Sequence, residues 1–154
     1  MEAVLFIGVQ GCGKTTFYKE RLFETHVRIS RDMVKTKARE RILIGACLAA
    51  MQPFVLDNTN PLASQRAEVI ESAHAAGFRV VACYFRCGMR EALWRNRRRP
   101  AVVPAPGVIA TFKKLQPPSW EEGFDAIRVV TTNEAGGFVV EEWMREQGDP
   151  LRPE

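Results

Sequence analysis

The chain has 154 residues, which is typical of one domain with a single hydrophobic core and too short for two catalytic domains. Hydrophobic residues make up 46% and charged residues 26% of the sequence, a balance that excludes a disordered chain and predicts a soluble globular protein. Residues 1–118 carry 19 Lys/Arg against 9 Asp/Glu and residues 119–154 carry 3 against 9, so this basic body indicates a phosphate-rich partner.

No segment is apolar for long enough to cross a membrane, because the longest apolar run, residues 42–51, is about half of the ~20 residues required. The first residues lack the basic flank and cleavable apolar core of a secretory leader, which predicts an intracellular, cytoplasmic protein without a membrane partner. The cysteines form neither a CxxC pair nor a Cys/His cluster, which disfavours disulfide and zinc roles, and we interpret Cys83 and Cys87 as core thiols.

Apolar β-rich segments alternate with segments of helical spacing, which predicts an α/β domain with a mostly parallel five-stranded sheet flanked by helices. We expect strands at residues 3–8, 27–30, 54–57, 80–85 and 126–130. Helices are expected at residues 14–22, 33–51, 89–98 and 108–115. A further helix is expected to begin with Asn60 as N-cap and Pro61 at the first helical position, and to end at Gly77. The acidic residues 134–154 are expected to extend a single domain 1–154 as a hairpin or short helix with a frayed end.

The strongest motif is a Walker A sequence between the first predicted strand and helix. Residues 8–15, GVQGCGKT, match GxxxxGK[ST] in the required strand-to-helix context. In such a loop, backbone N–H groups and the helix N-terminus surround phosphate oxygens, Lys14 reaches the β- and γ-phosphates, and the Thr15 hydroxyl binds Mg²⁺. The predicted nucleotide-binding residues are Gly8, Gly11, Cys12, Gly13, Lys14, Thr15 and Thr16.

This loop occurs in GTPases, ATPases and kinases, so other residues must decide between them. The chain has no NKxD guanine-reading sequence and is too short for most motor or transport ATPases, which leaves a small kinase. Asp32 follows the second predicted strand, at the edge where open α/β sheets bind ligands, and is our candidate general base. The same position also suits an N-cap of the following helix, and the two roles can coexist.

Further polar and basic residues follow the later strands. Asp57, at the end of the third strand, resembles the Walker B carboxylate that orients Mg²⁺, although a turn role is also open. Residues 86–99 contain six arginines and one acid, which indicates phosphate contact through an arginine-rich lid or a nucleic-acid surface, with about half of the arginines on a solvated face.

The chain resembles the kinase domain of polynucleotide 5′-hydroxyl kinases, both the phage enzyme and the kinase half of animal polynucleotide kinase-phosphatases. The resemblance covers about residues 3–130. Its order of motifs is the phosphate loop, Arg31-Asp32, Asp57-Asn58-Thr59-Asn60-Pro61, Ser64, Arg66, His74-Ala75-Ala76-Gly77, Arg95-Asn96 and Glu122-Gly123-Phe124-Asp125-Ala126-Ile127.

This resemblance implies a P-loop kinase fold and transfer of the γ-phosphate of ATP, with Mg²⁺, to the 5′-hydroxyl of DNA or RNA. It implies that Asp32 is the general base and that Arg95 and Arg99 are lid arginines that stabilise the transferred group. The expected acceptor contacts are Arg31, Lys35 and Asn58, and the expected metal ligands are Thr15 and Asp57. Lys35 stands where the phage enzyme has an arginine for the acceptor's 3′-phosphate. No sequence resembles the DxDGT motif of the phosphatase half, so no 3′-phosphatase activity is expected.

Two alternatives remain open from the sequence. The first is a P-loop kinase of a small metabolite, antibiotic or nucleoside, which requires a smaller and less basic acceptor cleft. The second is an ATP-binding regulatory module that transfers no phosphate, in which Asp32 would act only as a helix cap.

Overall fold

A six-stranded sheet lies at the centre of the molecule, in a computed structural model that describes residues 1–153. Its strand order is β2-β3-β1-β4-β5-β6; β1 to β5 are parallel, and β6 runs antiparallel to β5. The strands are Glu2–Ile7 (β1), Val27–Ile29 (β2), Phe54–Leu56 (β3), Arg79–Phe85 (β4), Ala126–Thr132 (β5) and Phe138–Trp143 (β6). The predicted α/β fold class is confirmed, whereas the prediction of five strands is wrong by one.

The sixth strand, β6, forms the hairpin that was one of the two expectations for the acidic end. Only its terminal residues, Phe138 and Trp143, are half-buried, and the four residues between them are exposed. It therefore lacks the apolar run by which the other strands are recognised. Its charges suit an edge strand, where Glu142 accepts a hydrogen bond of 2.6 Å from Arg128 of β5.

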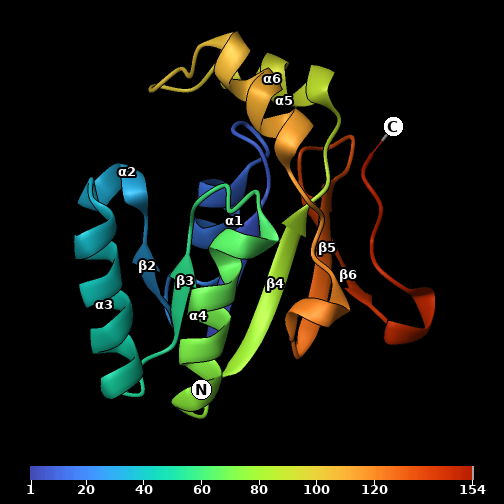
Figure 1. The fold of residues 1–154 in the computed structure, drawn as a ribbon. Helices are drawn as coiled ribbons and strands as arrows, with labels where there is room; N and C mark the ends of the chain where they lie inside the picture. The colour runs from blue at the N-terminus through green and yellow to red at the C-terminus, as the bar shows by residue number, and fades with distance from the viewer. Residues whose placement is uncertain (154) are drawn as a thin grey trace.

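The helices are Lys14–Arg21 (α1), Arg31–Val34 (α2), Lys37–Ala49 (α3), Ala63–Ala75 (α4), Met89–Asn96 (α5) and Ala105–Lys114 (α6), with short 3₁₀ turns at Trp120–Glu122 and Arg145–Gln147. In Figure 1, α3 and α4 lie in front of the sheet and α1 lies behind it, while α5 and α6 lie above the ends of the strands. Behind the sheet, Phe17 of α1 packs edge-on against Phe6 and Phe85. Among the described residues, no helix combines the length and hydrophobicity that a bilayer span requires.

Two helix predictions are wrong in detail. The single helix expected at 33–51 is divided into α2 and α3, because Lys35 adopts a φ of 72° and Thr36 caps α3 by accepting a hydrogen bond from the Arg39 N–H. Asn60 is not the N-cap of α4, and Pro61 is not in its first turn. The Asn60 amide donates instead to the Phe6 carbonyl (2.7 Å), and α4 begins after Leu62. The Gly77 stop is confirmed, with φ at 81°.

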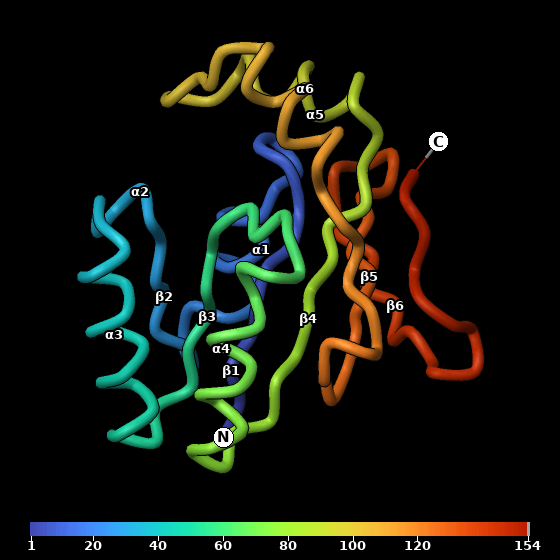
Figure 2. Tube along the Cα trace, viewed as in Figure 1, coloured from blue at the N-terminus to red at the C-terminus, as the bar shows by residue number. Residues whose placement is uncertain are grey.

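The parallel strands bring the functional loops together. Because β1 to β5 point the same way, the segments that follow β1, β2, β3 and β4 all begin at the same edge of the sheet. The tube in Figure 2 shows the segment between α5 and α6 extending above this edge, over the loops that follow the strands. The sheet thus brings the phosphate loop, the α2 segment and the α5–α6 segment, the predicted lid, to one edge.

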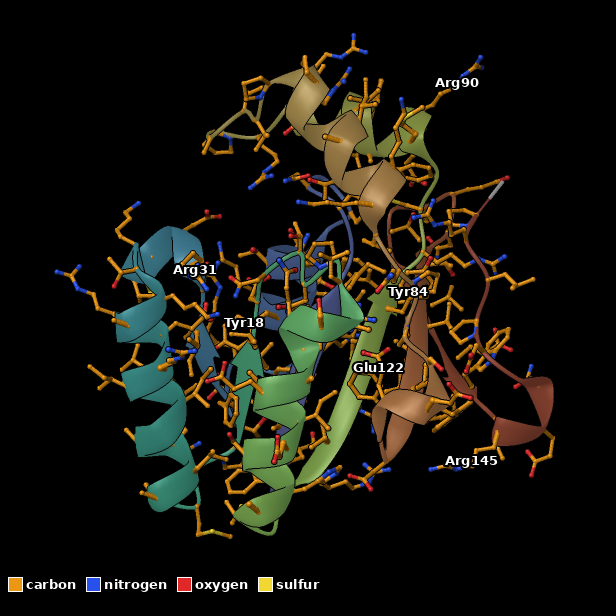
Figure 3. All side chains as sticks on the ribbon, in the orientation of Figure 1. Tyr18, Arg31, Tyr84, Arg90, Glu122 and Arg145 are labelled. Atoms are coloured by element: carbon orange, nitrogen blue, oxygen red, sulfur yellow. A yellow bond between two sulfur atoms is a disulfide. The ribbon has the colours of Figure 1, made fainter. Side chains whose placement is uncertain are left out.

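A buried ion pair fastens α4 to the segment before β5. The Arg66 guanidinium has no exposed surface; it donates to Glu122 at 2.7 and 2.8 Å and to the carbonyls of Asn60 and Gln116 at 2.9 Å. Figure 3 labels Glu122, which lies beside α4 in the short turn that precedes β5.

We predict that Arg66→Ala lowers the free energy of unfolding by about 3–5 kcal/mol, because it leaves the Glu122 carboxylate without its cation and two carbonyls without their hydrogen-bond donor. Chemical denaturation measures this loss. Arg41→Ala is the matched control, since its ion pair with Glu68 is exposed on both sides and should be worth less than about 1 kcal/mol. Equal losses of unfolding free energy in the two variants would contradict the larger stabilising role of the buried ion pair.

Candidate functional site

The phosphate loop joins β1 to α1 and has the backbone of an anion-binding turn. Gly11 and Gly13 have φ values of 85° and 87°, in the left-handed region that favours glycine. A Cβ atom at Gly11 would also clash with the Ala92 carbonyl oxygen of α5, so the lid helix rests directly on the loop. Glycine is required here both for the turn and for the close approach of α5.

Lys14 lies buried at the centre of this loop. Its ammonium group donates to the carbonyl oxygens of Gly8 (3.0 Å) and Val9 (2.8 Å). The pKa of Lys14 is lowered to about 8, mainly by burial; the charge of Asp57 opposes this shift, that of Arg99 adds to it, and that of Asp32 opposes it. Lys14 is therefore electrostatically coupled to both predicted carboxylates and to one of the predicted lid arginines.

Thr15 and Asp57, the expected metal ligands, are brought together as predicted from separate segments. The Thr15 hydroxyl donates to the Asp57 carboxylate at 2.9 Å, and Arg28 of β2 donates to the same oxygen, Oδ2, at 2.8 Å. A hydroxyl beside a carboxylate is an oxygen donor set suited to Mg²⁺ and its waters, so these two residues fit that ion. The described residues contain no group of three or more His, Cys, Asp and Glu side chains that could hold a metal alone, so the nucleotide's phosphates would complete the shell.

A pocket of about 600 Å³ opens beside the loop, between the α2–α3 segment and α4. The exposed side chain of Asp32 lies on its wall, together with Gln10 of the phosphate loop. Its apolar residues include Ile44, Leu48, Leu56, Pro61 and Val69, and its basic ones are Arg31, Lys37, Arg41 and Lys114. The pocket has the size of a small-molecule site and ends at the phosphate loop.

One wall of the pocket is a hydrogen-bonded network around Glu40. The Arg31 guanidinium donates to both oxygens of this buried carboxylate at 3.1 and 2.9 Å, and the Asn58 amide donates to it at 2.9 Å. The Arg31 N–H also donates to Asn58 Oδ1 at 2.8 Å. Arg31 and Asn58, both expected acceptor contacts, therefore line the pocket, and their hydrogen bonds to Glu40 hold α2, which carries Asp32, against α3. The sequence analysis missed Glu40, whose place on the buried side of α3 gave no signal.

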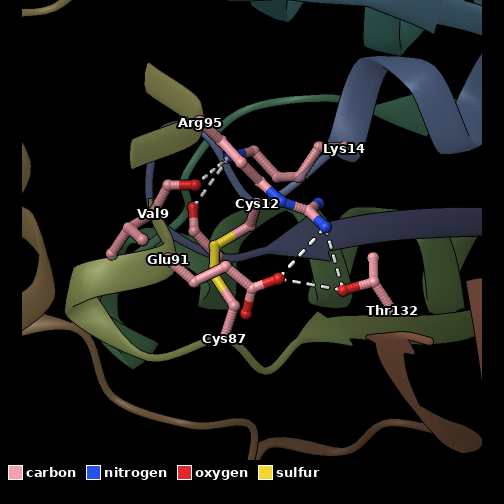
Figure 4. Close-up of a disulfide and its surroundings, with 8 residues drawn as sticks. Val9, Cys12, Lys14, Cys87, Glu91, Arg95 and Thr132 are labelled. Carbon is pink, nitrogen blue, oxygen red and sulfur yellow. Dashed lines mark hydrogen bonds and ion pairs between the residues drawn. A yellow bond between two sulfur atoms is a disulfide. The ribbon is translucent and has the colours of Figure 1, made fainter. Parts of the chain in front are cut away.

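The arginines of the predicted lid divide into two groups: Arg95 and Arg99 lie near the phosphate loop, whereas Arg90 and Arg98 are exposed. Arg95 donates to Thr132 of β5 and pairs with Glu91, both at 3.0 Å, and its Nη1 atom lies near Gly13 of the phosphate loop (Figure 4). Arg99 is half-buried and close enough to act on Lys14. Arg90 points away from the molecule in Figure 3, and Arg98 stacks on the exposed Trp94 ring at 3.7 Å.

Two of the predicted residues are exposed outside the pocket. Lys35 is exposed at the junction of α2 and α3 and does not line it, whereas Lys37 does. Thr16 is exposed on the first turn of α1. The sequence analysis also missed Arg28 and Thr132, which position Asp57 and Arg95, because both occupy ordinary strand positions.

The interpretation of the cysteines is wrong for one pair. Cys12 of the phosphate loop and Cys87, which follows β4, form a disulfide across 75 positions of sequence. They meet because β1 and β4 are neighbours and the segments after them begin side by side. Cys47 and Cys83 are buried free thiols, as a core role requires, and burial raises the pKa of Cys83 to about 12.

The strand order, the phosphate loop and the lid together define a P-loop, kinase-like ATP-binding domain. Residues 4–116 match the protein family described as "AAA domain", and the chain belongs to that family.

Solved structures share this fold at low sequence identity. The AvrRxo1-ORF1:AvrRxo1-ORF2 complex with ATP has a TM-score of 0.66 at 15% identity over 90% of this chain, and this chain spans 57% of that one. A gluconokinase from Sinorhizobium meliloti has a TM-score of 0.58 at 18% identity, covering 84% of this chain and 82% of its own. Chaetomium thermophilum Kti12, in complex with ADP-AlF3, has a TM-score of 0.58 at 17% identity, covering 87% and 92%.

We predict that affinity for ATP falls as the pH rises above about 8. In the free protein Lys14 has a pKa of about 8. Bound phosphates raise this pKa, so that ATP binding takes up a proton when the pH is above 8. The affinity for ATP is therefore full below pH 8 and falls above it, by up to about tenfold per pH unit. Titration with a fluorescent ATP analogue between pH 7 and 9.5 measures the slope. Lys14→Met should bind weakly with a flat profile; an unchanged slope in this variant would contradict the assignment.

Proposed function

We propose that this protein transfers the γ-phosphate of ATP to the 5′-hydroxyl of a polynucleotide, DNA or RNA, with Asp32 as the general base. The observation that carries the proposal is the position of Asp32. It lies on the wall of a pocket that ends at the phosphate loop, and its charge acts on Lys14. An alcohol in this pocket would lie between a carboxylate that takes its proton and the phosphate that it attacks.

The other side chains support an in-line transfer. Lys14, Arg95 and Arg99 would neutralise charge that develops on the transferred phosphoryl group, from the loop on one side and the lid on the other. Thr15 and Asp57 would hold Mg²⁺, which supplies charge neutralisation between the β- and γ-phosphates when bound. The Glu40 network would keep α2, and with it Asp32, in place while the substrates exchange.

The charge of the pocket favours an acceptor that carries phosphates. Lys37 and Lys114 line it without a hydrogen bond or ion pair to any described residue, whereas Arg31 and Arg41 are paired with Glu40 and Glu68. Two unpaired ammonium groups suit the backbone phosphates of a nucleic acid end, and the apolar residues suit its terminal base.

A small hydroxyl compound is the second candidate acceptor. The pocket volume of about 600 Å³ is sufficient for such a molecule, and the gluconokinase has the same fold. The two candidates are separated by measuring label transfer from γ-labelled ATP to 5′-OH oligonucleotides, nucleosides and sugars. The proposal expects transfer to oligonucleotides with a steep loss of binding as salt rises; transfer to a nucleoside or sugar alone would overturn it.

We predict that Asp32→Asn lowers the transfer rate by about 10²–10⁴-fold, because the amide cannot accept the hydroxyl proton. Affinity for ATP should change little, since among the described residues no hydrogen bond or ion pair joins Asp32 to the phosphate loop. Steady-state transfer and equilibrium nucleotide binding measure the two effects. Glu71→Gln, on the exposed surface of α4, is the matched loss of one charge and should leave both unchanged. Equal transfer by Asp32→Asn and wild type would exclude the base.

A further inference from the structure

The bond between Cys12 and Cys87 joins two parts of the cleft that a lid kinase must move relative to each other. Cys12 lies inside the phosphate loop, and Cys87 lies two residues before α5, with only Gly88 between it and the first lid helix. Two residues of α5 then contact the phosphate loop. Ala92 lies against Gly11, and Arg95 lies near Gly13. Figure 4 shows the disulfide together with Arg95.

We propose that Cys12 and Cys87 form a redox-modifiable site that controls nucleotide exchange. In the disulfide form, the segment that enters α5 is fixed to the phosphate loop, so the N-terminal end of α5 cannot separate from that loop. In the dithiol form this tether is absent, and α5 is held by the packing of Ala92 on Gly11 and by the hydrogen bonds that join Arg95 and Glu91 to Thr132. Oxidation should therefore slow the release of nucleotide, which is a common rate-limiting step in lid enzymes.

The two sulfur atoms differ in access, which gives the reaction a direction. Cys12 is 3% exposed, whereas Cys87 is half-buried, packs at the margin of the core and lines a small hollow beside Phe112. On reduction, an external thiol attacks the Cys87 sulfur and releases Cys12 as a thiol; a second external thiol then frees Cys87, and the two external thiols leave as one disulfide.

Oxidation reverses these steps with a low-molecular-weight disulfide of the glutathione class as the oxidant. The Cys87 sulfur attacks it and releases one thiol, and the Cys12 sulfur then displaces the second. Two protein thiols lose two protons and two electrons, and the small disulfide becomes two thiols. The other cysteines take no part, because Cys47 and Cys83 are both buried and separate from this pair.

The experiment measures the dissociation rate of a fluorescent ADP analogue from wild-type protein, oxidised with glutathione disulfide or reduced with dithiothreitol. Alkylation under denaturing conditions followed by mass spectrometry counts free thiols in each sample. We expect two free thiols and slow release after oxidation, then four free thiols and release faster by about fivefold or more after reduction. Cys87→Ser should release nucleotide fast in both conditions, and Cys47→Ser should behave as wild type.

Four free thiols after oxidation would overturn the proposal, as would equal release rates in samples shown to contain two and four thiols. The proposal rests on nucleotide binding and not on the acceptor. A protein that transfers no phosphate to polynucleotides but shows redox-dependent release would contradict the proposed function alone.

Discussion

The Lys14 ammonium group, held between the carbonyls of Gly8 and Val9, is the interaction on which the whole cleft depends. It places a buried positive charge just beyond the carboxyl end of β1. The surrounding charges act on it, since Asp57 and Asp32 favour the charged form of Lys14 while Arg99 opposes it. In the proposed reaction, a triphosphate replaces the two carbonyls as the partner of this ammonium group.

The parallel sheet explains why residues distant in sequence meet at this charge. β3 and β4 flank β1, so Asp57 follows one neighbour and Cys87 and α5 follow the other. β2 supplies Arg28 on Asp57 and leads directly into α2 with Asp32. Supporting contacts then fix these groups, with Glu40 holding α2 and Thr132 holding Arg95. The helix that carries the carboxylate and the arginine that the proposed reaction uses are thus both held by hydrogen bonds to neighbouring elements.

The sequence was sufficient to predict the features that depend on local chemistry. Left-handed glycines and a lysine at fixed spacing define the phosphate loop, and buried apolar runs define β1, β3 and β4. Features that depend on pairing over long distances were not predictable. β6 has an exposed, charged pattern and forms a strand because it pairs with the edge of β5. Asn60 has the residue type of a helix cap, but its amide donates to a carbonyl at the end of a strand. Cys12 and Cys87 meet only because their strands are neighbours in the sheet. Lys37, rather than Lys35, lines the pocket because the backbone turns at Lys35.

In the proposed reaction, the phosphate loop and Asp32 act on the same two substrates from different sides of the pocket. A crystal structure with Mg²⁺, a non-hydrolysable ATP analogue and a short 5′-OH oligonucleotide tests it most directly. The account predicts the γ-phosphate beside Lys14 and the 5′-hydroxyl within about 3 Å of the Asp32 carboxylate, in line with that phosphate. A γ-phosphate directed away from the pocket, or an acceptor bound on a surface that excludes Asp32, would contradict it.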